Sequence, residues 1–171
     1  MPRELSHIDE RGHAQMVGVG DKPVTHRVCM ARAEVKMAPE TLAKITEGRM
    51  PKGDVLLTAR LAGIQTAKRT DEWIPLCHSL PLDGIDIVLT PDPSGSRVLL
   101  EARVETHART GVEMEALVAV SAAGLTIYDM CKAIDREISI GGVRLVSKSG
   151  GKSGTWTRPD EEIASAEPAP E

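Results

Sequence analysis

Residues 112–134 read VEMEALVAVSAAGLTIYDMCKAI, and the rest of the fold is arranged around this segment. Its interior, Ala116–Ile127, spans twelve residues without a charge, whereas carboxylates and a lysine stand at its two ends. A helix that crosses a bilayer needs about 20 consecutive apolar residues, so this interior is too short to span one. We therefore expect a long helix that is buried in the core of a globular domain, and no membrane anchor.

Strand and helix patterns flank the central segment on both sides. The stretch 24–37 alternates and is rich in β-branched residues, and the turn sequence PDPSGS joins two further stretches of strand-like composition. Pro39 suits the first turn of a short helix that ends at Gly48, and Asp54 opens a second helix. Strands are predicted at residues 24–37, 84–90, 97–107 and 138–147, and helices at 37–48, 53–68 and 112–134.

The order of these elements is β-α-α-β-β-α-β. With the two early helices taken as one crossover, it predicts an α+β, ferredoxin-like fold: a split βαβ arrangement with an antiparallel sheet and helices on one face. In the second helix, Leu57, Leu61, Ile64 and Ala67 share one face at helical spacing, and we expect that face to be buried.

Length and composition predict one domain at residues 24–154, between a flexible arm at 1–23 and a disordered acidic tail at 155–171. With no Phe, one Tyr and two Trp, the core must be built from aliphatic side chains. The last twelve residues hold five carboxylates and no base, which leaves 21 basic residues against 20 acidic ones in the body. This balance argues against a nucleic-acid surface and leaves room for a local basic pocket.

The cysteines favour a reducing compartment. Cys29, Cys77 and Cys131 are odd in number and widely separated, with no CxxC pair, so we expect reduced thiols and no zinc site. The first fifteen residues contain no apolar run, so no secretory signal is expected. The sequence therefore favours a cytoplasmic protein.

The charged ends of the central helix lie too far apart for one small ligand. Glu113 and Glu115 stand in its first turn, and Asp129 and Lys132, three residues apart, share a face near its end. From Glu115 to Asp129 the helical rise gives roughly 21 Å. Either these are ordinary helix-end charges, or both ends are functional and the active site combines ends from different protomers.

Three further signals point to anion binding, each with a structural alternative. The segment Ser147–Gly154, SKSGGKSG, combines lysines, hydroxyls and glycines; it is either a flexible exit from a strand or an anion site. It is no Walker A loop, because residue 146 is valine where that motif needs glycine. His78 is either structural or a donor to phosphate, and Lys52, a cation at a helix start, would suit an anionic ligand.

Together these segments resemble the cyclic pyranopterin monophosphate synthase family, also called molybdenum cofactor biosynthesis protein C. The resemblance runs in family order from residue 5 to residue 154. Its motifs are Leu5-Ser-His-Ile, Lys52-Gly-Asp-Val, Ala62-Gly-Ile-Gln-Thr-Ala-Lys-Arg-Thr, Ile74-Pro-Leu-Cys-His, Thr110-Gly-Val-Glu-Met-Glu-Ala-Leu, Leu125-Thr-Ile-Tyr-Asp-Met-Cys-Lys-Ala and Val143-Arg-Leu-Val-Ser-Lys-Ser-Gly-Gly-Lys-Ser-Gly. One departure is Ser79, where the family usually has proline, which makes the stiffness of that loop an open question.

The resemblance implies a lyase that converts 3′,8-cyclo-7,8-dihydro-GTP to cyclic pyranopterin monophosphate and releases pyrophosphate, on the way to molybdenum cofactor. It implies a hexamer, a trimer of dimers, with sites at dimer interfaces and an upstream radical enzyme that supplies the substrate. No cofactor or protein-bound metal is implied, although Mg²⁺ could accompany the triphosphate.

The motifs also assign roles to residues. Asp129 and Lys132 would transfer protons, which a lysine of lowered pKa beside a carboxylate can do. Lysines near the triphosphate would stabilise the leaving pyrophosphate. The residues that the resemblance assigns to substrate binding are Lys52, Lys68, Leu76, Cys77, His78, Glu113, Met114, Glu115 and Lys148.

The rival interpretation is a non-catalytic ferredoxin-like module. An RNA-binding version needs aromatic side chains on the sheet, and this chain has no Phe and a single Tyr, on a helix. A catalytically dead nucleotide sensor is expected to lose Lys52, Asp129 or Lys132, and all three are present.

Overall fold

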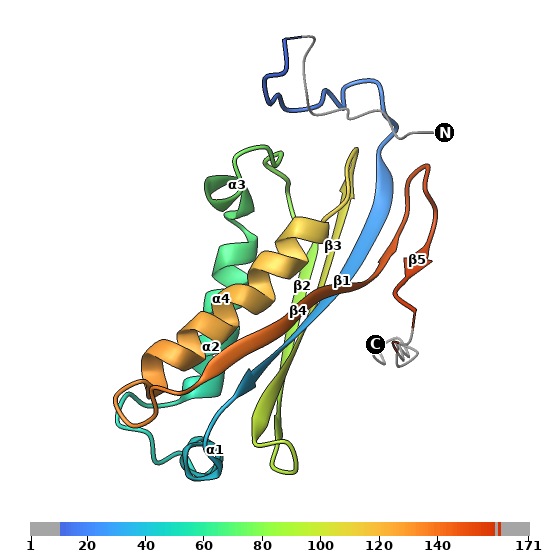
Figure 1. The fold of residues 1–171 in the computed structure, drawn as a ribbon. Coiled ribbons are helices and arrows are strands. Elements are labelled where there is room, and N and C mark those ends of the chain that lie inside the picture. The colour runs from blue at the N-terminus through green and yellow to red at the C-terminus, as the bar shows by residue number, and fades with distance from the viewer. Residues whose placement is uncertain (1–10, 160, 162–171) are drawn as a thin grey trace.

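A computed structural model describes residues 11–159 and residue 161. Five strands form one sheet in the order β2-β3-β1-β4-β5, and every pairing among the described residues is antiparallel (Figure 1). The strands are β1 (Thr25–Lys36), β2 (Gly84–Asp92), β3 (Arg97–Ala108), β4 (Ser139–Ser149) and β5 (Trp156–Thr157). The helices are α1 (Pro39–Thr46), α2 (Val55–Ala67), α3 (Thr70–Trp73) and α4 (Glu113–Cys131). This is the predicted α+β, ferredoxin-like fold.

The long helices α2 and α4 cover one face of the sheet, while α1 and α3 lie toward its two ends (Figure 1). α4 packs on β1, β3 and β4, and α2 packs on α4 and β2. At 19 residues α4 is long and apolar enough to cross a bilayer, but 61% of its apolar window is buried inside the fold. Its side chains at Ala116, Ala119, Ala123 and Ile127 are fully buried, so α4 is the predicted core helix.

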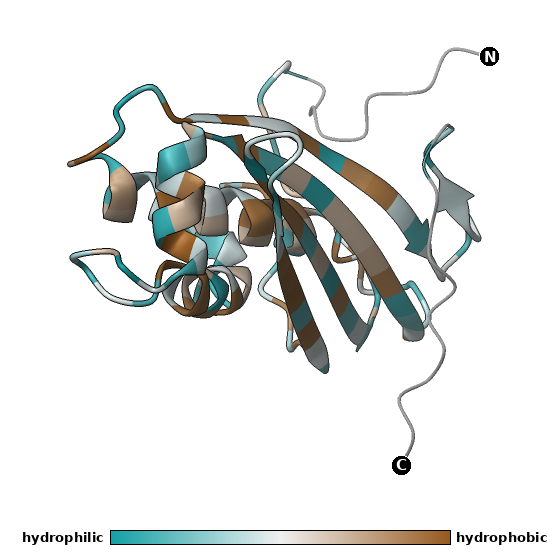
Figure 2. Cartoon of the chain, turned by 90° about the horizontal axis from the view of Figure 1, so that it is seen from below, coloured by the Kyte–Doolittle hydropathy of each residue, from teal (hydrophilic) through white to brown (hydrophobic). Residues whose placement is uncertain are grey.

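The inner face of the sheet is built from small and branched aliphatic side chains. Every second residue of β1 from Cys29 to Val35 is buried, and so is every second residue of β3 from Val98 to Ala108. Among the inward-facing pairs, Ala33 stands opposite Leu100, whereas Ala31 stands opposite Ala102. Figure 2 shows the resulting alternation of hydropathy along the strands. Buried alanines on β1, β3 and α4 let the helix pack closely on the sheet, so a core without Phe can still be close-packed.

The buried face of α2 differs from the predicted one. Leu57 and Leu61 are 54% and 58% exposed, whereas the buried residues are Val55, Ala59, Gly63 and Ala67. At Gly63 a Cβ would stand 2.9 Å from the backbone oxygen of Ala119 in α4. The two helix backbones therefore meet along small residues, and the larger leucines point outward. The prediction was wrong for Leu57 and Leu61, because helical spacing alone ranked the leucines above the small residues. Ala67 is buried as predicted, and Ile64 packs partly buried against the core.

The start of the predicted disordered tail is ordered. Trp156 and Thr157 pair with Lys148 and Ser147 of β4, and the Arg158 amide donates to the Val146 carbonyl at 2.8 Å. Glu161 forms ion pairs with Arg32 and Arg144 on the outer face of the sheet. The domain therefore extends past residue 154. Residues 162–171 and residues 1–10, with the Leu5-Ser-His-Ile motif, lie outside the described residues.

Candidate active site

The residues assigned by sequence fall into two groups at opposite ends of α4. At its C-terminal end lie Lys52, Asp129 and Lys132. At its N-terminal end lie Leu76, Cys77, His78, Glu113, Met114, Glu115 and Lys148. Lys68 is the exposed C-cap of α2. Among the described residues its side chain forms no hydrogen bond or ion pair with a member of either group. Within one chain the two groups stay apart by the length of the helix, roughly 21 Å at helical rise.

At the C-terminal end, two lysines hold one carboxylate. The Lys132 ammonium lies 2.7 Å from one Asp129 oxygen, and the Lys52 ammonium lies 2.9 Å from the other. Lys52 also donates to the Asp129 backbone carbonyl at 2.8 Å, where a cation complements the helix dipole. The Asp54 side chain caps α2 by accepting the Leu57 amide, and this fixes the turn that carries Lys52.

These contacts hold the pair in its charged form. The hydrogen bonds from Lys132 and Lys52 lower the pKa of Asp129 to about 2, and the hydrogen bond to Asp129 raises the pKa of Lys132. The expected lowering of the lysine pKa is therefore wrong for the chain by itself. The reason is exposure: about half of each side chain faces solvent, so desolvation contributes little.

At the N-terminal end, a pocket of about 240 Å³ opens beside the first turn of α4. Its lining residues are Val17, Val19, Lys22, Leu76, Cys77, His78, Leu80, Thr110, Gly111, Glu113, Met114 and Glu115. Glu115 is only 4% exposed, and burial, with added repulsion from Glu113 and Asp71, raises its pKa to about 7. Burial and then the charge of Glu115 raise the pKa of the Cys77 thiol. The pocket can thus hold a carboxyl group that exchanges protons near neutral pH.

A basic hollow of about 380 Å³ adjoins this pocket. It is lined by Lys22, Arg27, Arg109, Thr110, Gly111, Glu113, Lys148, Lys152 and Ser153, which bring five cations and one carboxylate together. The Lys148 ammonium lies 3.1 Å from Glu113 and so joins the hollow to the helix end. This excess of positive charge suits a polyanion.

The glycine-rich loop after β4 closes directly onto Arg27. Gly151 has φ +69°, and a Cβ there would stand 2.1 Å from the Arg27 guanidinium. Gly150 has φ +95°, and a Cβ there would stand 2.1 Å from the His26 carbonyl oxygen. Both positions therefore require glycine, which favours an anion site over a merely flexible exit from the strand.

Sequence reasoning missed Lys22, Arg27 and Arg109. Arg27 donates to the Arg109 carbonyl at 3.3 Å, and Arg109 donates to the Lys22 carbonyl at 3.2 Å. The available signal was the pairing of β1 with the end of β3, where Thr25 stands opposite Ala108. Strand prediction alone did not give that register, so these cations could not be placed together.

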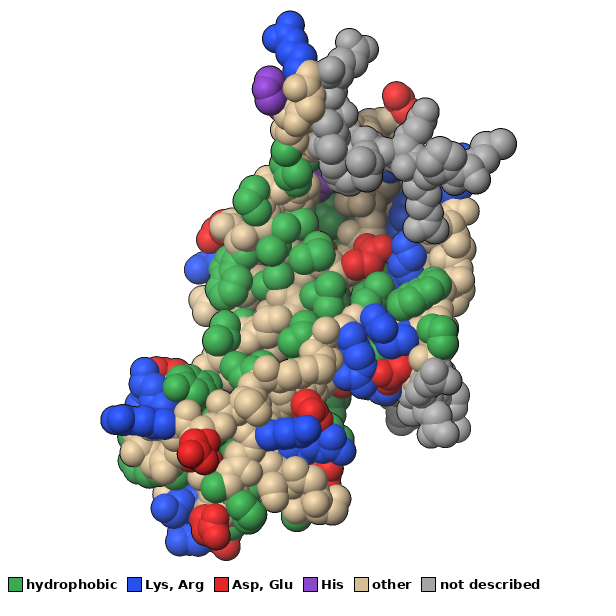
Figure 3. Space-filling view, in the orientation of Figure 1, with side chains coloured by type: hydrophobic (Ala, Val, Ile, Leu, Met, Phe, Trp, Pro, Cys, Tyr) green, Lys and Arg blue, Asp and Glu red, His purple; other side chains and the backbone are tan. Residues whose placement is uncertain are grey.

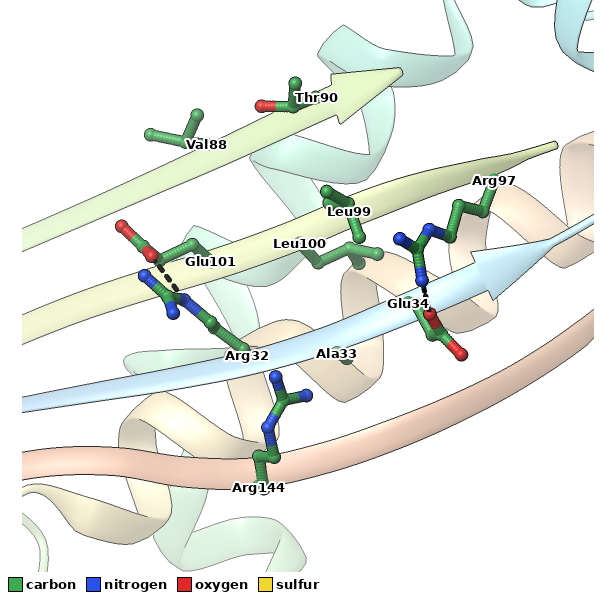
Figure 4. Close-up of a pocket in the computed structure, with 10 residues that line it drawn as sticks. All are labelled: Arg32, Ala33, Glu34, Val88, Thr90, Arg97, Leu99, Leu100, Glu101 and Arg144. Carbon is green, nitrogen blue, oxygen red and sulfur yellow. Dashed lines mark hydrogen bonds and ion pairs between the residues drawn. The ribbon is translucent and has the colours of Figure 1, made fainter. Parts of the chain in front are cut away.

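A larger hollow of about 410 Å³ lies on the open face of the sheet and holds none of the predicted residues (Figure 4). Its charges neutralise one another: Arg32 pairs with Glu101 at 2.7 Å, and Arg97 pairs with Glu34 at 2.6 Å (Figure 4). The remaining charged lining residue, Arg144, forms an ion pair with Glu161. A surface of paired charges offers little net charge to a polyanion, so we place the functional site at the ends of α4.

Comparison with known proteins identifies the family of the chain. The family model described as MoaC family matches residues 16–151. A relative from Pelotomaculum thermopropionicum, named cyclic pyranopterin monophosphate synthase, is 61% identical over 92% of this chain and 93% of its own length. Relatives of the same name from Thermomicrobium roseum and Chloroflexus aurantiacus are 55% and 58% identical, over 95% and 91% of this chain and 98% and 96% of their own. The chain therefore belongs to the MoaC family.

Proposed function

We propose that this chain is a lyase that converts 3′,8-cyclo-7,8-dihydro-GTP to cyclic pyranopterin monophosphate, with release of pyrophosphate, in molybdenum cofactor biosynthesis. The observation that carries the proposal is the basic hollow around Lys148, which opens beside the buried carboxyl group of Glu115. A triphosphate needs the first feature, and a ring that must gain and lose protons needs the second. The names of relatives with over half of their residues identical support the same reaction.

In this proposal the basic hollow binds the triphosphate. Lys22, Arg27, Arg109, Lys148 and Lys152 would neutralise its charge and stabilise the pyrophosphate as the bond to the α-phosphorus breaks. His78, Cys77 and Leu76 would contact the guanine-derived ring from the neighbouring pocket. Mg²⁺ would enter only as a counterion of the triphosphate, and the reaction uses no resident cofactor.

Proton transfer is assigned to Asp129 and Lys132, with Lys52 beside them. In the isolated chain this pair is exposed and fully charged. A substrate that covers it would remove water, and this desolvation disfavours the charged ammonium and so lowers the pKa of the lysine, which is the condition a general acid requires. Lys52, held within 2.9 Å of Asp129, is placed to contact the same ligand.

The two ends of α4 can act on one substrate only when they come from different chains. We therefore propose that the site is shared between protomers, in a hexamer built as a trimer of dimers, and that the enzyme works in the cytoplasm. A radical enzyme upstream would supply the substrate. Lys68, the C-cap of α2, would support the triphosphate from the rim of the site.

The direct test is incubation of the pure protein with enzymatically made 3′,8-cyclo-7,8-dihydro-GTP, followed by mass detection of the cyclic monophosphate. We expect product with the native chain and none with Lys132→Ala, because the proton-transfer group is lost. Arg60→Ala is the matched control: it also removes an exposed cation paired with a carboxylate, Asp86 at 3.4 Å, but away from the site. Product formation by a folded Lys132→Ala variant at the native rate would contradict the assignment.

A further inference from the structure

The chain beyond β4 turns back along that strand and ends on the open face of the sheet. β5 pairs antiparallel with Ser147 and Lys148, and Figure 1 shows the connecting turn at the edge of the sheet. In Figure 3 basic side chains gather along the edge of the molecule that carries β4 and β5, with acidic side chains among them. We call β5, Arg158 and Glu161 together the C-terminal strap.

The first part of the strap follows β4 closely. Beyond β5, the Arg158 amide donates to the Val146 carbonyl at 2.8 Å. The Arg158 guanidinium donates to the Leu145 carbonyl at 2.7 Å and lies 5.8 Å from the centre of the Trp156 ring. The strap is therefore held to β4 by backbone pairing and by one side chain that reaches past it.

The last described residue of the strap, Glu161, is fastened by two arginines from two strands. One carboxylate oxygen accepts from Arg144 of β4, and the other lies 2.7 Å from the Arg32 guanidinium of β1. Figure 4 shows both arginine side chains on the open face of the sheet. The Glu161 side chain is only 12% exposed, and the hydrogen bonds from Arg144 and then Arg32 lower its pKa. Charge-assisted bonds of this kind are the strong ones, so one carboxylate ties the strap to both strands.

The turn between β4 and the strap carries part of the basic hollow. It spans residues 150–154, and the Gly154 amide closes it by donating to the Gly151 carbonyl at 3.2 Å. Lys152 and Ser153 of this turn line the hollow. Among the residues that the structure describes, the Lys152 ammonium makes no hydrogen bond or ion pair. Its position is therefore set by the backbone of the turn, which β4 supports at one end and the strap at the other.

We propose that Glu161 is a positioning residue, which fastens the strap and thereby holds the turn at 150–154 in place to bind the triphosphate. The proposal rests on the proposed function and adds a residue to it. Glu161 does not line the hollow, so it acts through the turn. Without its tie, Lys152 meets the anion only in the molecules whose turn is in place. If that fraction falls to about one in ten, the apparent Kd rises about tenfold.

Binding of inorganic tripolyphosphate, measured by calorimetry, tests this without turnover. Glu161→Gln should raise the Kd about tenfold, since the binding-competent fraction falls. It should also speed hydrogen exchange at the Arg158 amide, which the strap protects. Arg144→Gln cuts the same tie from β4 and should weaken binding in the same way. A native Kd in both variants would overturn the proposal.

The matched control is Glu101→Gln. Glu101 also pairs with Arg32 at 2.7 Å on the open face, but it belongs to β3, and its removal leaves the bond between Arg144 and Glu161 in place. We expect native affinity for tripolyphosphate in this variant. Equal loss of affinity in Glu101→Gln and Glu161→Gln would mean that both changes merely loosen the sheet, and would reject the role of the strap.

A double-mutant cycle with Lys152 tests the route of the effect. Lys152→Ala should itself weaken tripolyphosphate binding. In that background Glu161→Gln should change the Kd by less than about twofold, because the cation that the strap positions is already gone. A loss as large as in the native background would show that Glu161 acts by another route, and would contradict the proposal.

Turnover separates this proposal from the proposed reaction. Glu161→Gln should raise the KM for 3′,8-cyclo-7,8-dihydro-GTP and leave kcat close to native, because bound substrate itself draws the turn into place. Weaker tripolyphosphate binding by Glu161→Gln, with no product from the native chain, would leave the strap standing and reject the reaction. Product formation by Glu161→Gln with the native KM would leave the reaction standing and reject the role of Glu161.

Discussion

Two carboxylates on the same helix are driven in opposite directions by their surroundings. At Asp129 the hydrogen bonds from two lysines lower the pKa to about 2, and at Glu115 burial raises the pKa to about 7. Such a separation of pKa values assigns different chemical roles to groups of one type. Asp129 holds a lysine charged, and Glu115 can carry a proton near neutral pH.

The raised pKa of Glu115 has a consequence for stability. The folded chain binds this proton more tightly than the unfolded chain, so the free energy of unfolding falls as pH rises from about 4.5 to about 7. Glu115→Gln removes this loss, and we expect it to raise the free energy of unfolding at pH 8 by up to about 3 kcal/mol while leaving it unchanged near pH 4. Denaturant unfolding at several pH values and constant protein concentration measures the difference.

The control for that measurement is Glu113→Gln. Glu113 is part-exposed and paired with Lys148, so its neutralisation loses that ion pair and removes only the smaller, repulsive contribution to the raised pKa of Glu115. We therefore expect a much smaller gain from Glu113→Gln than from Glu115→Gln. Parallel pH profiles for Glu115→Gln and its parent would show that Glu115 is ionised in the folded chain at neutral pH.

At this scale the sequence predicted short-range pairs and missed long-range ones. Asp129 and Lys132 meet because three residues of helix make them neighbours, which spacing alone foresees. Lys52 reaches the same carboxylate from 77 residues away, and Arg27 reaches Arg109 from 82. Only the packing of α2 on α4 and the register of β1 with β3 create those contacts.

Among the elements, the packing of α2 on α4 depends on the absence of a side chain. Gly63 faces Ala119 where the backbones approach, and a Cβ would also stand 2.5 Å from Ile87 Cδ1. The outward leucines of α2 have the helical spacing expected of a core face, yet the small residues form it. Spacing predicts that a helix has an apolar face, but it does not say which of two such faces is buried when a neighbouring helix packs closely.

Gly63→Ala therefore has two opposite effects on the free energy of unfolding. Alanine favours the helix by about 1 kcal/mol over glycine, but overpacking against a backbone oxygen costs about 1–3 kcal/mol. We expect a net decrease in the free energy of unfolding, measured by urea titration. Gly141→Ala, in β4 with nothing within 4 Å of the added Cβ, is the control and should not show the packing cost. A stabilised Gly63→Ala variant would mean that the two helices lie further apart than described.

In the whole molecule, the proposed function requires that each site is shared between two chains, because α4 separates its two groups of residues. Glu115→Ala and Asp129→Ala, each inactive alone, should therefore recover activity when mixed and allowed to exchange subunits. A mixed dimer has one site with both ends intact, so complete exchange should restore up to about a quarter of native activity by random pairing. Mass detection of the cyclic monophosphate before and after exchange measures the recovery. No recovery despite demonstrated exchange would place both ends in one chain.

The order of elements was enough to predict the sheet, because a β-α-β-β-α-β chain has few ways to bury its helices on one face. It did not predict β5 or the contacts of Glu161, since two strand residues beside an acidic tail carry no periodic signal. The sequence predicted a shared site from the distance along the helix between Glu115 and Asp129, which follows from the rise per residue.

The length of α4, which leads us to propose a site shared between two chains, also has a genetic consequence. Consider a cell with two copies of the gene, one normal and one altered. An allele damaged at one end of the helix would spoil one site of a mixed dimer and leave the other working, so it would behave as recessive. An allele damaged at both ends would spoil both sites, because each site would receive one bad half. Such an allele would be dominant-negative, although its chain folds and assembles normally.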